Sequence, residues 1–278
     1  MRASGSVDSA RALGPHDHLC WAYDDRADFL AAALDFLAEG LAAHQRVQYI
    51  AEGDRNSLRR DLDGLDDHGC RGEDVELRPL DHVYGPDDVV DAEAQVAAYR
   101  RATDRALADG FSGLRVAAEA TPLVRTAAQR RAFTRYEHLV DRYMVDHPFS
   151  ALCGYDRSEL GREAVAEMAC RHPLGRSGTT PFRMFAAGDA DLCFAGEVDI
   201  ASIDLFRRTL ADLMDASGRA EIMIDARDLT FVDHRSLTAL EEEAARRGAS
   251  VVLRSPLATS HRLAGLLGLQ AVRVEAPA

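Results

Sequence analysis

The stretch HLCWAY, residues 18–23, and the segment that follows it decide the fold of the first part of the chain. HLCWAY is a short, nearly continuous apolar run, which is typical of a strand buried on both faces of a sheet. Over residues 26–44, Phe29, Ala33 and Leu37 recur at helical spacing and predict an amphipathic helix. A buried strand that leads directly into such a helix is the opening unit of a parallel sheet.

The same alternation of strands and helices continues to residue 173. The pattern predicts strands over residues 46–51, 75–80, 114–118 and 149–155, and helices over residues 56–68, 87–109, 126–147 and 163–171. Alternation of this kind predicts an α/β fold with a parallel sheet, helices on both faces and right-handed crossovers. We therefore expect a first domain over residues 15–173.

Pro, Gly, Ser and Thr cluster over residues 174–181 without apolar periodicity, which predicts a linker. Residues 182–278 then predict a smaller α/β domain. Its first two strands, residues 182–187 and 191–194, are expected to pair as a hairpin around Gly188-Asp189. Further strands over residues 220–225, 250–253 and 271–274, with helices between them, predict a mixed sheet packed against helices.

The basic residues of the chain narrow the possible chemistry. All 33 of them are Arg, and the 278 residues include no Lys. A Walker A phosphate loop, a protein kinase and a pyridoxal-phosphate enzyme each need a Lys, so their standard forms are excluded. No G-x-S-x-G or H-E-x-x-H motif occurs either, and we expect a protein without catalytic activity.

Charge and cysteine content predict where the protein acts. The formal net charge of -13 opposes non-specific binding to phosphate backbones, so no nucleic-acid partner is expected. Five scattered cysteines without a C-x-x-C pair indicate reduced thiols and a cytoplasmic location. No apolar run is long enough for a membrane span, and the first residues lack the apolar core of a secretory signal, so no membrane association is expected.

Three motifs of the second domain occur together: FAGEVDI at residues 194–200, DARDL at 225–229 and FVDHRSL at 231–237. In this combination the domain resembles the STAS family, the sulfate transporter and anti-sigma-factor antagonist domains. The resemblance implies a domain that binds a protein partner, either an anti-sigma factor or its kinase. It also implies a Ser or Thr at a helix start that a partner kinase phosphorylates.

The sequence departs from the STAS pattern at that helix start. Asp233 matches the family, but Arg235 occupies the phosphorylation position and Ser236 stands where the family has Gly. Because Arg cannot accept the phosphate, we expect partner binding without the usual phospho-switch, with Ser236 as a weak substitute acceptor. The candidate partner-binding residues are Asp233, His234, Arg235 and Ser236. Arg235 either pairs with an acidic partner or points into solvent.

Residues 17–173 resemble a second family, the MEDS sensory domains of methanogen and methylotroph regulators. The residues that carry this resemblance are His18-Leu19-Cys20, Tyr23, Glu119, Tyr136-Glu137, Cys153-Gly154-Tyr155-Asp156 and His172-Pro173. The resemblance implies a sensory role and a divergent RecA-like sheet. Together, the two resemblances predict a signalling protein that senses a small molecule or a redox state and passes this on by protein binding.

Parallel sheets bind ligands at the carboxyl ends of their strands, where acidic and aromatic residues gather here. The candidate ligand-binding residues are His18, Cys20, Tyr23, Glu52, Glu119, Cys153, Tyr155 and Asp156. They predict an acid-rich, aromatic-lined site for a small or cationic ligand. Two alternatives stay open: acids such as Asp156 cap the next helix, and Glu119, at a Walker-B-like strand end, belongs to a degenerate nucleotide site.

A metal or haem sensor is a further alternative. His18 and Cys20 point to one face of their strand, and if they converged with Cys153 and His172 they could bind zinc or iron. Buried cysteines are more often small core residues, so the sequence favours a domain with no metal and no cofactor. A redox-sensing thiol is equally open.

Overall fold

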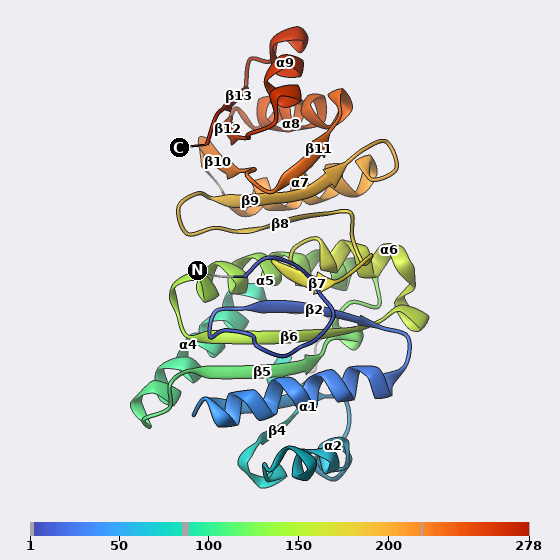
Figure 1. Cartoon of the computed structure of the whole chain (residues 1–278), viewed down its shortest axis with the longest axis vertical. Coiled ribbons are helices and arrows are strands. Elements are labelled where there is room, and N and C mark those ends of the chain that lie inside the picture. The colour runs from blue at the N-terminus through green and yellow to red at the C-terminus, as the bar shows by residue number, and fades with distance from the viewer. Residues whose placement is uncertain (1–2, 85–88, 218, 278) are drawn as a thin grey trace. The chain divides into compact units, whose positions relative to one another are not determined.

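A computed structural model describes residues 3–84, 89–217 and 219–277 of the chain (Figure 1). The chain divides into two compact units, Met1–Thr179 and Thr180–Ala278. Within the described ranges, no helix combines the length and the apolar character that crossing a bilayer requires.

The first unit is built on a sheet of seven strands, all of them parallel. In spatial order the strands are β1 (Gly5–Val7), β7 (Leu174–Arg176), β2 (His18–Tyr23), β6 (Phe149–Asp156), β5 (Leu114–Glu119), β3 (Arg46–Ala51) and β4 (Glu76–Pro79). The predicted parallel sheet is therefore confirmed. The three residues of β7 lie within the stretch for which the sequence predicts a linker. They form a strand there because they pair with β1 and β2.

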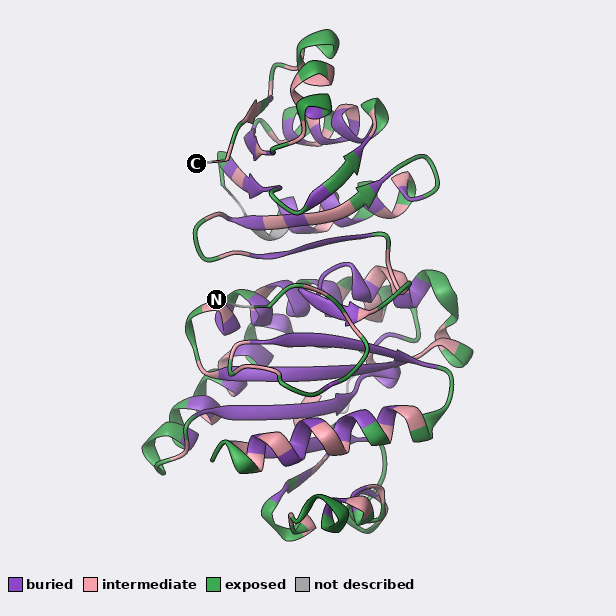
Figure 2. Cartoon of the chain, viewed as in Figure 1, coloured by how far each residue is buried: buried purple, intermediate pink, exposed green. Residues whose placement is uncertain are grey.

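Helices cover both faces of this sheet, as the alternation predicts. One face carries α1 (Arg26–Ala42) and α2 (Arg55–Asp61), and the other carries α4 (Ala92–Ala108), α5 (Ala127–Asp146) and α6 (Arg157–Ala169). Along β2, Leu19, Trp21 and Tyr23 join the core under α1, whereas Cys20 and Ala22 join the core under α5 and α6. The central strands are consequently buried on both faces (Figure 2).

Two helices begin at other residues than the apolar pattern indicates. α6 begins with one turn at Arg157 that Asp156 caps, and Gly161, at φ 78° and ψ 161°, breaks the helix, so the predicted helix over residues 163–171 corresponds to the part after this break. α4 begins at Ala92 behind its capping residue Asp91; the predicted positions 87 and 88 lie outside the described residues. The connections contain a short helix, α3 (Leu80–Tyr84), and the 3-10 turns Asp63–His68, Gly72–Asp74 and Thr121–Leu123.

The second unit has a mixed sheet, in agreement with the sequence prediction. β8 (Phe182–Ala186) pairs antiparallel with β9 (Leu192–Val198). From one edge, the parallel strands are β11 (Leu229–Val232), β9, β10 (Glu221–Asp225), β12 (Ser250–Arg254) and β13 (Val272–Glu275). The unit's helices are α7 (Ile203–Ser217), α8 (His234–Arg247) and α9 (Ala258–Leu267). The rings of Phe182, Phe194 and Phe206 pack together in its core.

Candidate functional site

The order of the strands identifies a candidate edge in the first unit. β2 and β6 are neighbours, but the helices that follow them, α1 and α6, lie on opposite faces. Open α/β sheets bind their ligands at the carboxyl ends of the strands where such a reversal occurs. The register places Tyr23 beside Asp156 and Glu119 beside Gly154 at this edge.

A buried hydrogen bond joins two of the predicted residues at this edge. The Tyr23 hydroxyl donates to Glu119 Oε1 at 2.9 Å, and the Thr121 amide donates to the same oxygen at 3.1 Å. Both Tyr23 and Glu119 are buried. Burial raises the pKa of the Glu119 carboxyl, although the hydrogen bonds from Thr121 and Tyr23 oppose that shift. Glu119 is therefore held by its own chain rather than left free at a strand end.

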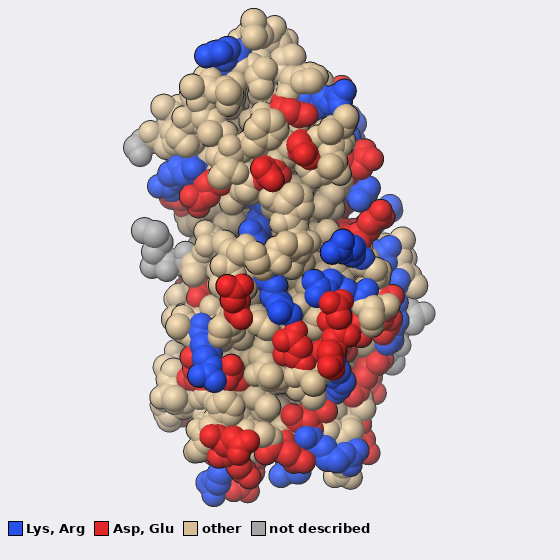
Figure 3. All heavy atoms as spheres, turned by 45° about the vertical axis from the view of Figure 1, so that its right-hand side comes forward, with Lys and Arg blue, Asp and Glu red and all other residues tan. Residues whose placement is uncertain are grey.

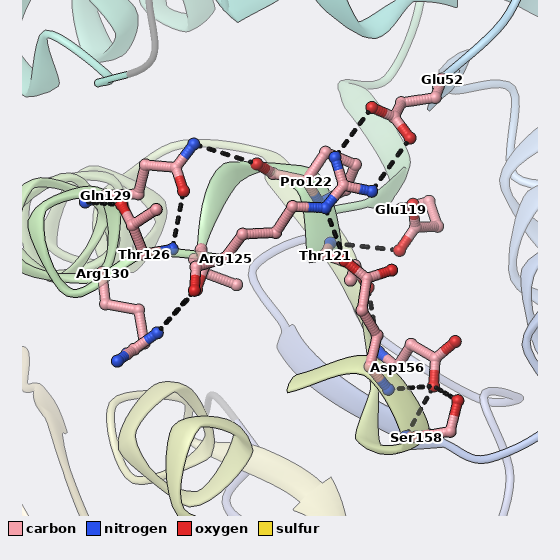
Figure 4. A network of polar contacts seen from close by, with 12 residues as sticks. Glu52, Glu119, Thr121, Pro122, Arg125, Thr126, Gln129, Arg130, Asp156 and Ser158 are labelled. Carbon is pink, nitrogen blue, oxygen red and sulfur yellow. Dashed lines mark hydrogen bonds and ion pairs between the residues drawn. The ribbon is translucent and has the colours of Figure 1, made fainter. Parts of the chain in front are cut away.

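Arg125 crosses the outer part of the edge (Figure 4). Its Nε donates to Glu159 at 2.5 Å, and its two terminal nitrogens donate to Glu52 at 3.2 and 3.3 Å. All three side chains are about half exposed, so water screens the two ion pairs. The acids Glu52 and Glu159 thus face a cation that solvent and solutes reach.

Asp156 caps a helix, which is the role that the sequence pattern indicates as the alternative to ligand binding for acids at the strand ends. One of its carboxylate oxygens accepts hydrogen bonds from the amides of Ser158 at 2.7 Å and Glu159 at 3.3 Å, at the start of α6. Asp25 caps α1 in the same way through the amide of Ala27. We call Tyr23, Glu52, Glu119 and Asp156, together with Arg125 and Glu159, the rim.

The other four predicted ligand-binding residues, His18, Cys20, Cys153 and Tyr155, do not belong to the rim. They lie on the sheet face under α5 and α6, and each is buried. His18 is at the first position of β2, at the far end of that strand from Tyr23. The structure therefore divides the predicted site into an edge and an interior.

In the interior, His18, Glu137, Cys153 and His172 bring one potential ligand atom each within 4.8 Å of one another. We call these four residues the buried cluster. Glu137 Oε2 lies 3.2 Å from His18 Nε2 and 3.6 Å from His172 Nε2. Cys153 Sγ lies 3.6 Å from His18 Nε2. Cys20 pairs with Cys153 across β2 and β6, but it is not among the four.

Neighbouring groups fix the orientation of these side chains. His18 Nδ1 lies 3.0 Å from Asp141 Oδ1, and His172 Nδ1 lies 3.0 Å from the carbonyl oxygen of Met168. Because a carbonyl only accepts, His172 carries its proton on Nδ1 and presents the lone pair of Nε2 to the cluster. The Tyr155 hydroxyl donates to Glu137 Oε1 at 2.7 Å, which leaves Oε2 to face the two imidazoles.

The charges inside the cluster follow from these contacts. Burial lowers the pKa of His18, but Glu137 and Asp141 outweigh burial and raise this pKa above its usual value. Burial raises the pKa of Glu137, yet His172 and His18 bring it below its usual value. Burial and the nearby His18 lower the pKa of His172 to about 4, so this ring is neutral. Burial raises the pKa of Cys153, which is a thiol.

Sequence reasoning named Glu137 only as part of the family resemblance and did not predict it as a ligand. The signal was present on α5, whose apolar stripe includes Phe133, Tyr136 and Val140. Glu137 and Asp141 lie one turn apart beside this stripe, and both are buried. An acid on the core face of a helix needs a polar partner, which here comes from strands distant in the sequence.

In the second unit, the predicted partner-binding residues form the start of α8. Asp233 caps the helix by accepting from the Ser236 amide at 2.8 Å and from the Ser236 hydroxyl at 2.7 Å. Ser236 is fully buried, whereas His234 and Arg235 are exposed. The four residues thus separate into an inner pair that builds the helix start and an outer pair that faces solvent.

Comparison with known families assigns the first unit to the class of sensory domains. The matching family is MEDS, described as the MEthanogen/methylotroph, DcmR Sensory domain, and the match spans residues 17–173. This is more than half of the chain, which therefore belongs to the MEDS family. His18, Glu137, Cys153, His172 and the rim all lie inside the matched range. No curated protein matches the chain in sequence.

Proposed function

We propose that this protein is a non-catalytic cytoplasmic regulator that senses a small molecule at the rim and relays the signal through its second unit. The relay partner is an anti-sigma factor or its kinase, as the STAS resemblance implies. Family membership supports the sensory half of the proposal. The observation that carries the relay half is the surface at the start of α8 in the second unit.

That surface combines apolar and basic side chains. Ile200 is 63% exposed and Phe231 is 47% exposed, two of the few large hydrophobic side chains open to solvent among the described residues. Phe231 precedes the helix cap by two residues, and the Ser236 hydroxyl lies 3.5 Å from the Val198 carbonyl, just before Ile200. Exposed apolar residues beside the charge of Arg235 are typical of a docking site for an acidic protein partner.

The contacts of Ser236 support a relay without phosphorylation. Its hydroxyl is buried and donates to Asp233, so a kinase would have to open the first turn of α8 to reach it. Arg235, which is accessible, has no group that accepts a phosphate. Regulation would then come from a change in the availability of the surface, driven by a ligand that favours one arrangement of the protein.

The rim supports a small cationic ligand better than the alternatives. Glu52 and Glu159 are accessible carboxylates that a ligand cation could take over from Arg125. A phosphate would meet Asp24 and Asp25 at the end of β2, which disfavours the nucleotide alternative. Cys153 is a buried thiol rather than a thiolate, which disfavours redox sensing there.

The surface charge does not favour a nucleic-acid partner. On the face that Figure 3 shows, acidic and basic side chains are intermingled, which offers a nucleic acid no continuous basic track.

Binding of the full-length protein to purified anti-sigma factors of the source organism, immobilised on a biosensor, tests the relay. We expect one of them to bind, and Arg235→Glu to weaken that binding at least tenfold. An acid near a helix N-terminus is favourable by up to about 1 kcal/mol, so this variant should fold. The matched control is Arg246→Glu near the other end of α8, which should bind normally. Unchanged affinity of Arg235→Glu, or no binding by any anti-sigma factor, overturns the relay.

The melting temperature in the presence of small amines tests the sensing half. A ligand that binds only the folded protein raises this temperature. We expect a rise with an amine of suitable size that Glu52→Gln reduces, and no rise with magnesium and ATP. A rise with ATP that Glu119→Gln abolishes would favour the nucleotide site instead.

A further inference from the structure

We propose that the buried cluster binds one divalent metal ion of the zinc type. The ligands are His18 Nε2, His172 Nε2, Cys153 Sγ and Glu137 Oε2. The inference concerns the interior of the first unit and does not depend on the rim or on a protein partner.

The donor set matches the chemistry of zinc. Two imidazole nitrogens, one sulfur and one carboxylate oxygen are the ligands that Zn²⁺ takes in proteins, and four of them complete a tetrahedral site. With bonds of about 2.0–2.3 Å, neighbouring ligands of a tetrahedral ion lie about 3.3–3.8 Å apart. Three of the six distances between the four cluster atoms are 3.2, 3.6 and 3.6 Å, and all six are within 4.8 Å. An ion therefore needs only small side-chain movements to be held.

Two of the proposed ligand atoms are left without a hydrogen bond. Glu137 Oε2 and His172 Nε2 are buried and make no hydrogen bond within the part of the chain that the structure describes, although Glu137 Oε2 lies 3.2 Å from His18 Nε2 as an ion pair. Buried polar atoms without a hydrogen bond are rare in folded proteins and call for an explanation. A bound ion supplies one, because both atoms face the cluster and each would donate an electron pair to the metal.

The surrounding contacts are those expected around metal ligands. A ligating histidine usually donates its other ring N–H to a carboxylate or a backbone carbonyl. Asp141 lies at hydrogen-bond distance from Nδ1 of His18, and the Met168 carbonyl accepts the hydrogen bond from Nδ1 of His172. Tyr155 holds the second oxygen of Glu137. Three of the four ligands, His18, His172 and Glu137, are thus oriented before any ion arrives.

Metal binding requires protons to leave the site, because a thiol and an imidazole ligate only through a deprotonated sulfur or nitrogen. The metal forms one bond to each of the four ligands, while the sulfur proton of Cys153 and any proton on His18 Nε2 leave to solvent.

The site joins segments far apart in the sequence: the first residue of β2, the middle of α5, β6, and the turn between α6 and β7. The side chains of His18, Glu137 and His172 have no solvent exposure, so the ion must enter during folding or through a transient opening. A test should therefore add metal while the chain refolds.

The experiment refolds the full-length, chelator-treated protein with Co²⁺ or Zn²⁺, removes unbound metal and counts bound ions by mass spectrometry. We expect one ion per chain, and for Co²⁺ an absorption band from charge transfer between thiolate and metal. Cys153→Ser should remove that band. Asp141→Asn, which weakens the support of His18, should weaken metal affinity about 10–100-fold.

Two cysteine variants provide matched controls, Cys20→Ser beside the cluster and Cys193→Ser in the second unit. Both should keep the band and the stoichiometry. Circular dichroism of each variant identifies any that fails to fold, and Glu137→Gln, nearly identical in shape, then tests the ligand set independently. A wild-type protein that binds less than a tenth of an ion per chain overturns the proposal. So does a cobalt band that survives in Cys153→Ser or disappears in Cys20→Ser.

Discussion

The rim and the buried cluster are built from similar residues, but their surroundings give them opposite properties. At the rim, Glu52 and Glu159 meet Arg125 in water. In the cluster, Glu137 meets His18 and His172 where no water reaches. Exposed ion pairs rearrange at little cost, whereas a buried pair resists any change to one partner. The comparison teaches that burial, rather than the number of charges, separates a replaceable contact from a fixed one.

The largest effect is expected in the cluster, from Glu137→Ala in metal-free protein. The change leaves His18 with Asp141 as its only acidic partner and deprives the Tyr155 hydroxyl of its acceptor. Breaking a buried ion pair from one side typically costs about 3–5 kcal/mol. Urea unfolding of the first unit should show a loss of that size, while Glu163→Ala, an exposed acid on α6, should change little. A loss below about 1 kcal/mol for Glu137→Ala would show that the cluster is not a tight ion pair.

A smaller effect is expected from Tyr23→Phe, at the buried inner part of the rim. Glu119 then loses the hydroxyl donor but keeps the Thr121 amide. Removing one donor from a buried carboxyl costs about 1–3 kcal/mol. The unfolding free energy should fall by this amount, and Glu119→Gln, which keeps an acceptor for Tyr23, should lose less. If Tyr23→Phe and the wild type have the same unfolding free energy, water must replace the lost hydroxyl as a donor to Glu119, which would contradict its burial.

The smallest effect is expected from Arg125→Ala, at the exposed part of the rim. Two half-exposed ion pairs disappear, and each is worth at most about 1 kcal/mol. The difference from wild type in unfolding free energy should shrink further as sodium chloride is raised, because salt screens exposed charges. A large loss of unfolding free energy that does not change with salt would show that Arg125 makes a fixed contact rather than a replaceable one.

The fold of each unit could be predicted because its longer elements have a clear apolar periodicity. HLCWAY and the stripe of α1 identify the parallel sheet without further information. The short strands β1, β7 and β11, of three or four residues each, were not predicted, whereas β4 and β13, equally short, were recognised because they follow predicted helices in the strand–helix alternation. β7 also lies among the Gly, Ser and Thr residues that indicate a linker, and only its pairing with β2 makes it a strand.

The candidate site was harder to predict than the fold. The sequence shows that Tyr23 ends a strand and that His18 begins it, but not that the two belong to different environments. Strand position predicts the rim, since carboxyl ends share one edge. The cluster depends on which faces of α5 and of the turn before β7 meet β2 and β6, and this is a property of packing. His18, Cys153 and His172 could be proposed as a group, whereas Glu137 required the structure.

The pairing of β1 and β7 with the rest of the sheet determines which ends a stable fragment of this sensory domain needs. The family match spans residues 17–173 and therefore omits both strands. A fragment with these ends would lose the pairing of β7 with Leu19 and Cys20 and would leave that side of β2 without a neighbouring strand. Open edges of this kind recruit strands from other molecules, so such a fragment would tend to self-associate and aggregate. The strands β1 and β7 thus protect the domain, although both lie outside its family signature.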